Sequence, residues 1–336
     1  PASCHSTRML RIVVLVLISL SLAGCYYLQA ARGQLELTRK REPIDDILED
    51  AATSPELAER LRLVQEARQF SIDVLGLPDN ETYRTYADIE RDFVVWSVVA
   101  APEFSLQART WCFPVAGCVS YRGYFSEQAA RREAGRLADD GYDVFVGGVA
   151  AYSTLGKLRD PVLSSMMNWD DVQLVAVLFH ELAHQVLYVK GDSGFNESFA
   201  TAVEEFGVYR WLESRGQTAE IDRYESRREL RQALMAETAA ARTDLENLYA
   251  GALPDDEKRR EKQARLELLA ADMAAVVERA GNGAGRWQNG ELNNARLATM
   301  TLYEGRLPEF RALFEQCEQR IACFYEEARA LAASLE

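Results

Sequence analysis

Histidine is scarce in this sequence: its 336 residues include only His5, His180 and His184. A basic excess is also missing, because 52 acidic residues against 38 lysines and arginines give a net charge of −14. Nucleic-acid-binding proteins usually carry a basic surface, so we expect no nucleic-acid partner. No apolar run reaches the roughly 20 residues of a membrane-spanning helix. A hydrophobic content of 48% is nevertheless enough for a sizeable core in one or two domains.

The N-terminal segment has the pattern of an export signal. Arg8 and Arg11 precede an apolar run over 12–20, and small residues lead to Cys25. A charged region, a short apolar region and small residues are typical of a cleaved signal peptide. The letters Leu-Ala-Gly-Cys resemble the bacterial lipoprotein box, whose cysteine is lipidated and becomes the new N-terminus. We therefore expect residues 1–24 to be a lipoprotein signal peptide; an uncleaved anchor is the alternative.

Both remaining histidines lie in one short motif, His180-Glu181-Leu182-Ala183-His184. Histidines four apart on a helix lie about 40° apart around its axis, so both rings can reach one metal ion. Neutral imidazoles suit Zn²⁺, and a catalytic zinc site has three protein ligands and an open fourth position. Glu181 is placed to act as general base, as in metallopeptidases. The motif predicts one zinc ion per chain, with two satisfied core histidines as the alternative.

The third ligand is predicted to be Glu197. Asp192, directly after the zinc helix, would have to fold back about two helical turns to reach the histidines. Glu204 and Glu205 lie too far along the next helix if that helix begins beside the metal; Glu204 could support a histidine or simply be solvated. Glu197 follows Asn196, the expected cap of that helix, after twelve residues in which the chain can reverse.

Periodic patterns elsewhere predict a mostly helical chain with a small sheet. Apolar residues recur at threes and fours in the helical stretches, whereas β-branched and aromatic residues dominate the strands. Asn168 is expected to cap the zinc helix and Lys190-Gly191 to end it. The segment 121–124, Tyr-Arg-Gly-Tyr, could line a cleft. The predicted elements are helices over 26–75, with starts at Pro43 and Ser54-Pro55, and over 126–140, 168–190 and 196–215, and strands over 93–100 and 143–152.

The C-terminal part is predicted to begin with a helical hairpin. Residues 217–280 are rich in Ala, Glu, Arg and Leu and are interrupted at 251–256, which is typical of two long helices with charged outer faces. We expect the hairpin to pack within the chain; a partner-binding arm is the alternative. Further helices are predicted near Leu292 and from Pro308.

Four cysteines follow Cys25. Pro114 lies between Cys112 and Cys118, in a turn that makes a local disulfide reasonable in an oxidising compartment. Cys317 and Cys323 are harder to pair, because six residues of helix advance about 9 Å and turn the side chains apart. Either the helix breaks between them or they remain unpaired with each other, and we favour a break.

Taken together, the motifs resemble a family of predicted bacterial aminopeptidases, lipoproteins grouped with the peptidases that use a glutamate as third zinc ligand. The resemblance covers essentially the whole chain after residue 24. It implies zinc at His180, His184 and Glu197, with Glu181 as catalytic base. The motifs that carry it are Leu-Ala-Gly-Cys, Trp-Cys-Phe-Pro-Val-Ala-Gly-Cys, Tyr-Arg-Gly-Tyr-Phe, His-Glu-Leu-Ala-His, Asn-Glu-Ser-Phe-Ala and Asn-Asn-Ala-Arg-Leu.

The expected fold is α+β and mostly α-helical, with a gluzincin-like zinc-peptidase core, a small sheet and a helical hairpin. We expect an N-terminal helical segment over 25–85, the core over 86–216, and a helical region over 217–336 that completes the active-site cleft. The expected location is the bacterial cell envelope, with Cys25 anchored in a membrane, the outer membrane favoured, and the domain facing the periplasm.

The predicted function is zinc-dependent hydrolysis of peptides, by an aminopeptidase. Tyr303, Arg296 and Tyr152 are candidate donors to the oxyanion, and Arg296 could instead bind a substrate carboxylate. The spacing from His184 to Glu197 is shorter than in the well-known aminopeptidases of this type, and their amine-anchoring motif is not recognisable. An envelope endopeptidase is therefore one alternative, and a non-catalytic tethered assembly or chaperone-like lipoprotein is another.

Overall fold

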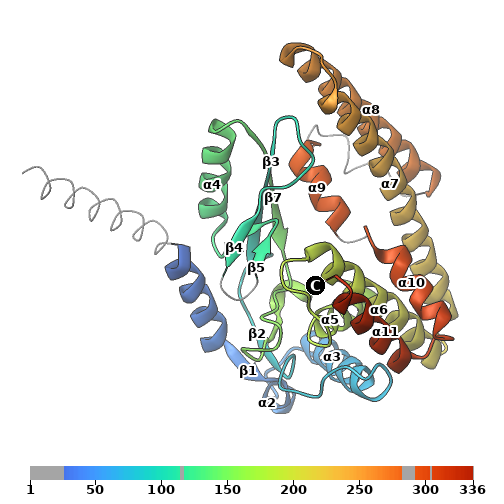
Figure 1. Cartoon of the computed structure of the whole chain (residues 1–336). Coiled ribbons are helices and arrows are strands. Elements are labelled where there is room, and N and C mark those ends of the chain that lie inside the picture. The colour runs from blue at the N-terminus through green and yellow to red at the C-terminus, as the bar shows by residue number, and fades with distance from the viewer. Residues whose placement is uncertain (1–25, 114–116, 282–291, 303–304, 336) are drawn as a thin grey trace, which may run out of the picture.

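A computed structural model describes residues 26–113, 117–281, 292–302 and 305–335. Helices dominate it and the sheets are small (Figure 1), which confirms an α+β, mostly helical fold. Within the described ranges, no helix is both long and apolar enough to cross a membrane. The predicted divisions at residues 85 and 216 stay predictions.

The N-terminal segment folds against the zinc-motif helices. A helix over 26–39 leads to β1 (Arg41–Pro43), α2 (Ile44–Glu49) and α3 (Pro55–Asp73). The Ser54 side chain accepts a hydrogen bond from the Leu57 backbone N–H, so the predicted start of α3 is confirmed. Strand β1 pairs antiparallel with β2 (Thr85–Ala87), and β2 pairs in parallel with β8 (Val162–Leu163), just before the short helix η1 (Ser164–Met166).

A second sheet has the order β6-β3-β7, all antiparallel. Its strands are β3 (Val95–Pro102), β6 (Arg122–Tyr124) and β7 (Tyr142–Val149). Successive strand residues point to opposite faces. Val98 and Ala100 pack towards α4 (Glu127–Asp139), whereas Val99 and Ala101 pack towards α9 (Asn294–Leu302). The sheet is therefore covered by a helix on each face (Figure 1), which explains its apolar sequence.

Two disulfides close local turns. Cys112 and Cys118 lie opposite each other in the hairpin of β4 (Trp111–Phe113) and β5 (Gly117–Val119) and are bonded, as predicted. Cys317 and Cys323 are also bonded. The expected break is present, since α10 (Leu307–Gln316) ends before α11 (Ile321–Ala333) begins. Glu318 and Gln319 have positive φ there, a conformation in which a helix cannot continue.

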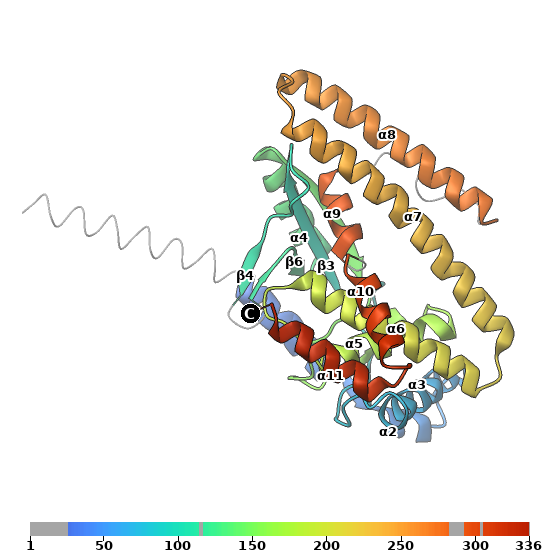
Figure 2. The same cartoon turned by 45° about the vertical axis from the view of Figure 1, so that its right-hand side comes forward.

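The long hairpin packs within the chain. Its helices are α7 (Thr218–Ala250) and α8 (Asp255–Arg279). Leu245 and Leu269 form a buried cluster with Leu106 and Leu297, from the segment after β3 and from α9. On α8, the Lys262 Nζ lies 2.7 Å from an Asp143 carboxylate oxygen on β7. Both apolar and charged contacts thus hold the hairpin beside the sheet (Figures 1 and 2).

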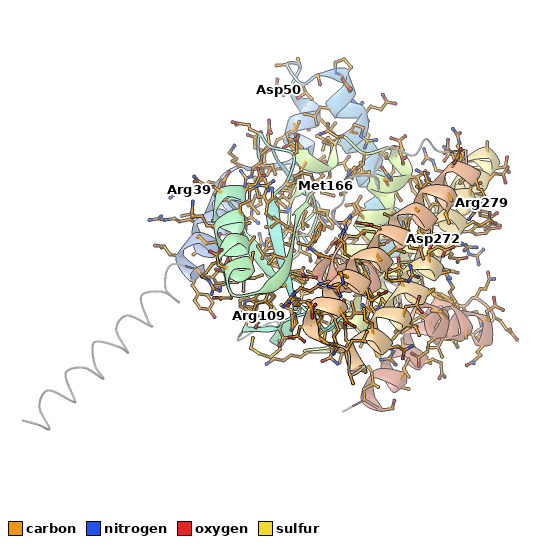
Figure 3. The ribbon with its side chains drawn as sticks, turned by 90° about the horizontal axis from the view of Figure 1, so that it is seen from above. Arg39, Asp50, Arg109, Met166, Asp272 and Arg279 are labelled. Carbon is orange, nitrogen blue, oxygen red and sulfur yellow. A yellow bond between two sulfur atoms is a disulfide. The ribbon has the colours of Figure 1, made fainter. Side chains whose placement is uncertain are left out.

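The central helices are α5 (Asp171–Ala183) and α6 (Ser193–Ser214), which carry the zinc motif and Glu197 and pack closely together. Their large apolar core includes Met166 of η1, which lies in the middle of the molecule, whereas Arg39 and Asp50 lie at its periphery (Figure 3).

Three predicted helix ends are wrong. Asp170, not Asn168, caps α5 by accepting a hydrogen bond from the Gln173 N–H, and its charge favours the N-terminus of the helix. Helix α5 stops at Ala183, well before Lys190. Asp192 caps α6, so Asn196 lies inside that helix.

Asn196 instead bonds to the connection between α5 and α6. Its side-chain oxygen accepts from the Val189 N–H and its amide donates to the Val189 carbonyl, both at 2.7 Å. The two hydrogen bonds tie the connection between the helices to the first turn of α6, next to Glu197.

Candidate metal centre

The two histidines are held by α5, a helix whose residues are mostly buried. Leu174, Leu178 and Leu182 of α5 are fully buried and fix its rotation. The opposing helix has Gly207 where a Cβ would come within 2.7 Å of the Phe179 ring. This glycine lets α6 approach α5 closely, so that acidic side chains of α6 can reach the histidines.

His180, His184 and Glu197 come together as the sequence predicts. Each offers one ligand atom, and the three atoms lie within 4.8 Å of one another. A Glu197 carboxylate oxygen lies 3.2 Å from the His180 Nε2 and 3.9 Å from the His184 Nε2. Both histidines are 7% exposed. The His184 ring lies at the C-terminal cap of α5, so this site uses the last turn of the helix.

Glu204 completes the surroundings of His180. Its carboxylate oxygen lies 3.0 Å from the His180 Nδ1, on the opposite side of the ring from Glu197. The two glutamates are seven residues apart on one face of α6, so both can meet the same ring. A merely solvated Glu204 is therefore wrong: α6 begins at Ser193 and runs past the histidines. Metal-ligating histidines usually have such a carboxylate partner, which orients the ring and raises its basicity.

The role of Glu204 makes a first prediction. Glu204→Ala is expected to weaken zinc binding about 10- to 100-fold without abolishing it, because the carboxylate orients a ligand but is not one. Competition with a chromophoric chelator measures the affinity. Glu213→Ala, at an exposed acid of the same helix that pairs with Arg210, is the matched control. Unchanged affinity in Glu204→Ala, or a loss as complete as in Glu197→Ala, would contradict this role.

The electrostatics of the site fit a cation. Burial lowers the pKa of His180, but hydrogen bonds to Glu197 and Glu204 raise it more, so the net pKa is well above its usual value. Burial also raises the pKa of Glu197, but its hydrogen bond to His180 and the nearby histidine charges bring the net value below its usual range. The two carboxylates thus stabilise positive charge between them.

His184 has the properties of a neutral ligand. Burial and, to a smaller extent, the charge of His180 lower its pKa to about 4, although the charge of Glu197 acts in the opposite direction. Metal ligation requires the unprotonated imidazole. Among the described residues its buried Nδ1 has no hydrogen-bond partner, so its position is set by packing and by what its Nε2 faces. Two imidazoles and a carboxylate form a donor set that suits Zn²⁺.

Glu181 lies beside His180 in the wall of a cavity of about 620 Å³. Residues from the end of β7, from α5, α6 and α7, and from α9 surround this cavity. The pKa of Glu181 is raised to about 7, mainly by burial; the charge of His180 opposes this rise, and the negative charges of Glu197 and other carboxylates add to it. A carboxyl group with a pKa near neutrality can both take up and release a proton at physiological pH.

Two tyrosines near the site were not predicted as site residues. Tyr121 keeps 39% of its surface exposed, yet desolvation raises its pKa and the charges of Glu197 and Glu181 raise it further. The ring of Tyr188 lies edge-on to that of His184, with 6.5 Å between centroids. The sequence indicated only that the Tyr-Arg-Gly-Tyr segment, which contains Tyr121, could line a cleft. Tyr188 follows His184 at helical spacing.

Two of the predicted oxyanion donors, Arg296 and Tyr152, make ring contacts beside other residues. The Arg296 guanidinium lies over the Phe145 ring at 4.1 Å, beside the sheet, and is not among the described residues that line the cavity. The Tyr152 ring packs against Phe125 with 5.6 Å between centroids. Tyr303 lies outside the described residues. The catalytic roles of these three stay predictions.

Comparison with known proteins gives a family match. A family model described as "Putative aminopeptidase" matches residues 25–336. No curated protein matches the chain, and no solved structure does.

Proposed function

The chain belongs to the putative aminopeptidase family, and we propose from this premise that it is a zinc-dependent aminopeptidase with a gluzincin-like site. One observation supports the proposal most: His180, His184 and Glu197 present their ligand atoms within 4.8 Å of one another, with Glu181 in the adjoining cavity wall. Three N and O ligands would hold one zinc ion and leave a fourth position for water.

Different residues of the chain are assigned to different steps of peptide hydrolysis. Zinc held by His180, His184 and Glu197 would supply a Lewis acid to polarise the scissile carbonyl and lower the pKa of water. Glu181 accepts a proton from the attacking water and later donates it to the leaving amine. Tyr121, whose raised pKa keeps its hydroxyl protonated, is a candidate donor to the developing oxyanion. Glu204 holds the His180 ring in one orientation.

Peptides with free and blocked N-termini test the proposed specificity. An aminopeptidase is expected to cleave a free peptide and to lose nearly all kcat/KM when the same peptide is acetylated, because the α-amino group is part of what it binds. The substrate series is leucyl peptides and their N-acetyl forms with zinc-loaded protein. Equal cleavage of both forms would favour the endopeptidase, and cleavage of neither would favour the non-catalytic alternative.

We also propose that the protein works outside the cytoplasm, tethered through Cys25. The family match starts at residue 25, where the lipoprotein box ends. Cys112–Cys118 and Cys317–Cys323 are disulfides, and structural disulfides are typical of oxidising compartments such as the bacterial periplasm. The outer membrane is the favoured site of the anchor.

Cys25→Ser tests the tether. Loss of the acceptor thiol should abolish lipid attachment and leave an unprocessed precursor or a soluble species. Incorporation of labelled fatty acid, followed by membrane fractionation, measures this directly. Labelled fatty acid that still enters the mutant would show that the lipoprotein box is misread.

A further inference from the structure

The cavity beside the metal centre has a cationic wall that the proposed chemistry does not use. Arg227, Arg228 and Arg231 line it, and all three come from α7. Residues three and four apart share a helix face, so one stretch of the hairpin supplies the whole wall. His180 and Glu181 line the same cavity, whereas His184 and Glu197 do not, so the cavity connects the arginines to the His180 edge of the candidate metal centre.

The acidic side chains in the same cavity are mostly engaged elsewhere. Glu204 contacts the His180 ring. Glu205 forms two hydrogen bonds with the Arg311 guanidinium, at 2.8 and 2.6 Å. Both carboxylates are therefore bonded to groups other than Arg228. Arg227 is itself paired, with Asp170 at the start of α5, at 2.6 Å.

Arg228 is different from its neighbours. Its Nε is buried, and among the described residues it has no hydrogen-bond partner; no described carboxylate forms an ion pair with its guanidinium. Because no described carboxylate neutralises its charge on the cavity wall, Arg228 is available to an anionic ligand in the cavity. The charge of Arg228 is also felt by Tyr224, another residue of the cavity wall. Burial and the charges of Glu204 and Glu205 raise the pKa of Tyr224, whereas the charges of Arg231 and Arg228 lower it.

Apolar side chains also line the cavity. Val172 and Ala176 come from α5, Leu234 and Met235 from α7, and Met300 from α9. A ligand that fills this compartment is therefore expected to combine an aliphatic portion with one anionic end. Guanidinium groups bind carboxylates through two parallel hydrogen bonds, which fixes both position and orientation.

We propose that Arg228 forms a carboxylate-binding subsite, so that the preferred substrates are peptides with a carboxylate close to the scissile bond. The carboxylate is either the C-terminus of a short peptide or an acidic side chain. This inference rests on the proposed peptidase function and adds a substrate class to it. Arg228 is a specificity residue, because it contacts a part of the substrate that does not react.

Two matched substrate pairs test the subsite and separate the two sources of carboxylate. The first pair is alanyl-leucine and alanyl-leucinamide, and the second is the glutamyl and glutaminyl amides of aminomethylcoumarin. Zinc-loaded wild type is expected to prefer the charged member of one pair about 10- to 100-fold in kcat/KM, as for hydrogen bonds between charged groups. Arg228→Gln should lose that preference, mainly through a higher KM for the charged member.

The matched control is Arg223→Gln. Arg223 lies on the same helix, pairs with Glu220 and does not line this cavity, so its substitution should leave both ratios unchanged. Arg228→Lys, which keeps the charge but not the two parallel hydrogen bonds, should retain part of the preference. Thermal unfolding checks that each variant is folded.

Each outcome supports or overturns either the subsite or the peptidase function. Hydrolysis by wild type with equal rates within both pairs, or a preference that survives in Arg228→Gln, overturns the subsite and leaves the peptidase function standing. Absence of any hydrolysis overturns the peptidase function. In that case calorimetry with the same pairs decides the subsite alone: tighter binding of a charged member by wild type but not by Arg228→Gln supports it, and equal binding overturns it.

Discussion

Glu181→Gln is expected to lower kcat by about 10²- to 10⁴-fold while one zinc ion stays bound. A glutamine fills nearly the same volume but cannot accept the proton of the attacking water. Zinc should remain, because His180, His184 and Glu197 are untouched and their ligand atoms are grouped by the packing of α5 against α6. The loss should appear in kcat and in kcat/KM alike, as for an interaction made in the transition state.

Metal analysis and steady-state kinetics on the same preparation check this prediction. Gln173→Ala is the control, since Gln173 lines the same cavity from the same helix but lies two turns from the motif. Its kcat should stay close to that of the wild type. Near-normal turnover by zinc-loaded Glu181→Gln would remove Glu181 from the mechanism.

Glu197→Ala is expected to lose zinc affinity and activity together. The Glu197 carboxylate is the one in contact with the Nε2 atoms of both histidines, at 3.2 and 3.9 Å. Two imidazoles alone leave a zinc site one protein ligand short, so the ion should be lost on desalting. Metal content after desalting, and the zinc-induced rise in melting temperature, measure this loss.

Two neighbouring acids serve as controls for Glu197, because each makes a contact away from the metal ligands. Asp192 caps α6 by accepting from the Phe195 N–H at 2.9 Å, so Asp192→Ala should cost about 0.5–2 kcal/mol of stability but keep stoichiometric zinc. Glu205 pairs with Arg311, and Glu205→Ala should also keep zinc. If Glu197→Ala still copurifies with one tightly held zinc, Glu204 becomes the candidate ligand.

The spacing within the motif accounts for what could be predicted. Helical geometry alone puts His180 and His184 on one face, and the twelve residues that follow allow the return needed to bring Glu197 to them. The caps were harder, because Asn168 and Asp170, or Asn196 and Asp192, are both good caps within a few residues of each other. The choice in each case is made by tertiary packing, which a local pattern does not contain.

Long-range packing explains what was missed. Glu204 reaches His180 because α6 begins before Glu197 and runs alongside α5, and that depends on the real position of the helix start. Tyr121 approaches Glu197 and Glu181 from a hairpin far away in sequence. The arginines of the cavity belong to a stretch of α7 whose composition predicts only a charged outer face. Each depends on how separate elements dock.

Zinc titration of metal-stripped protein, followed by peptide hydrolysis, tests the central claim most directly. Protein stripped with a chelator should be inactive, and activity should rise in proportion to added Zn²⁺ and level off at one equivalent per chain. Glu197→Ala should not recover at that equivalent. Peptide hydrolysis that persists in the stripped protein, or that stays absent when one zinc ion is bound, would contradict a zinc peptidase built on His180, His184 and Glu197.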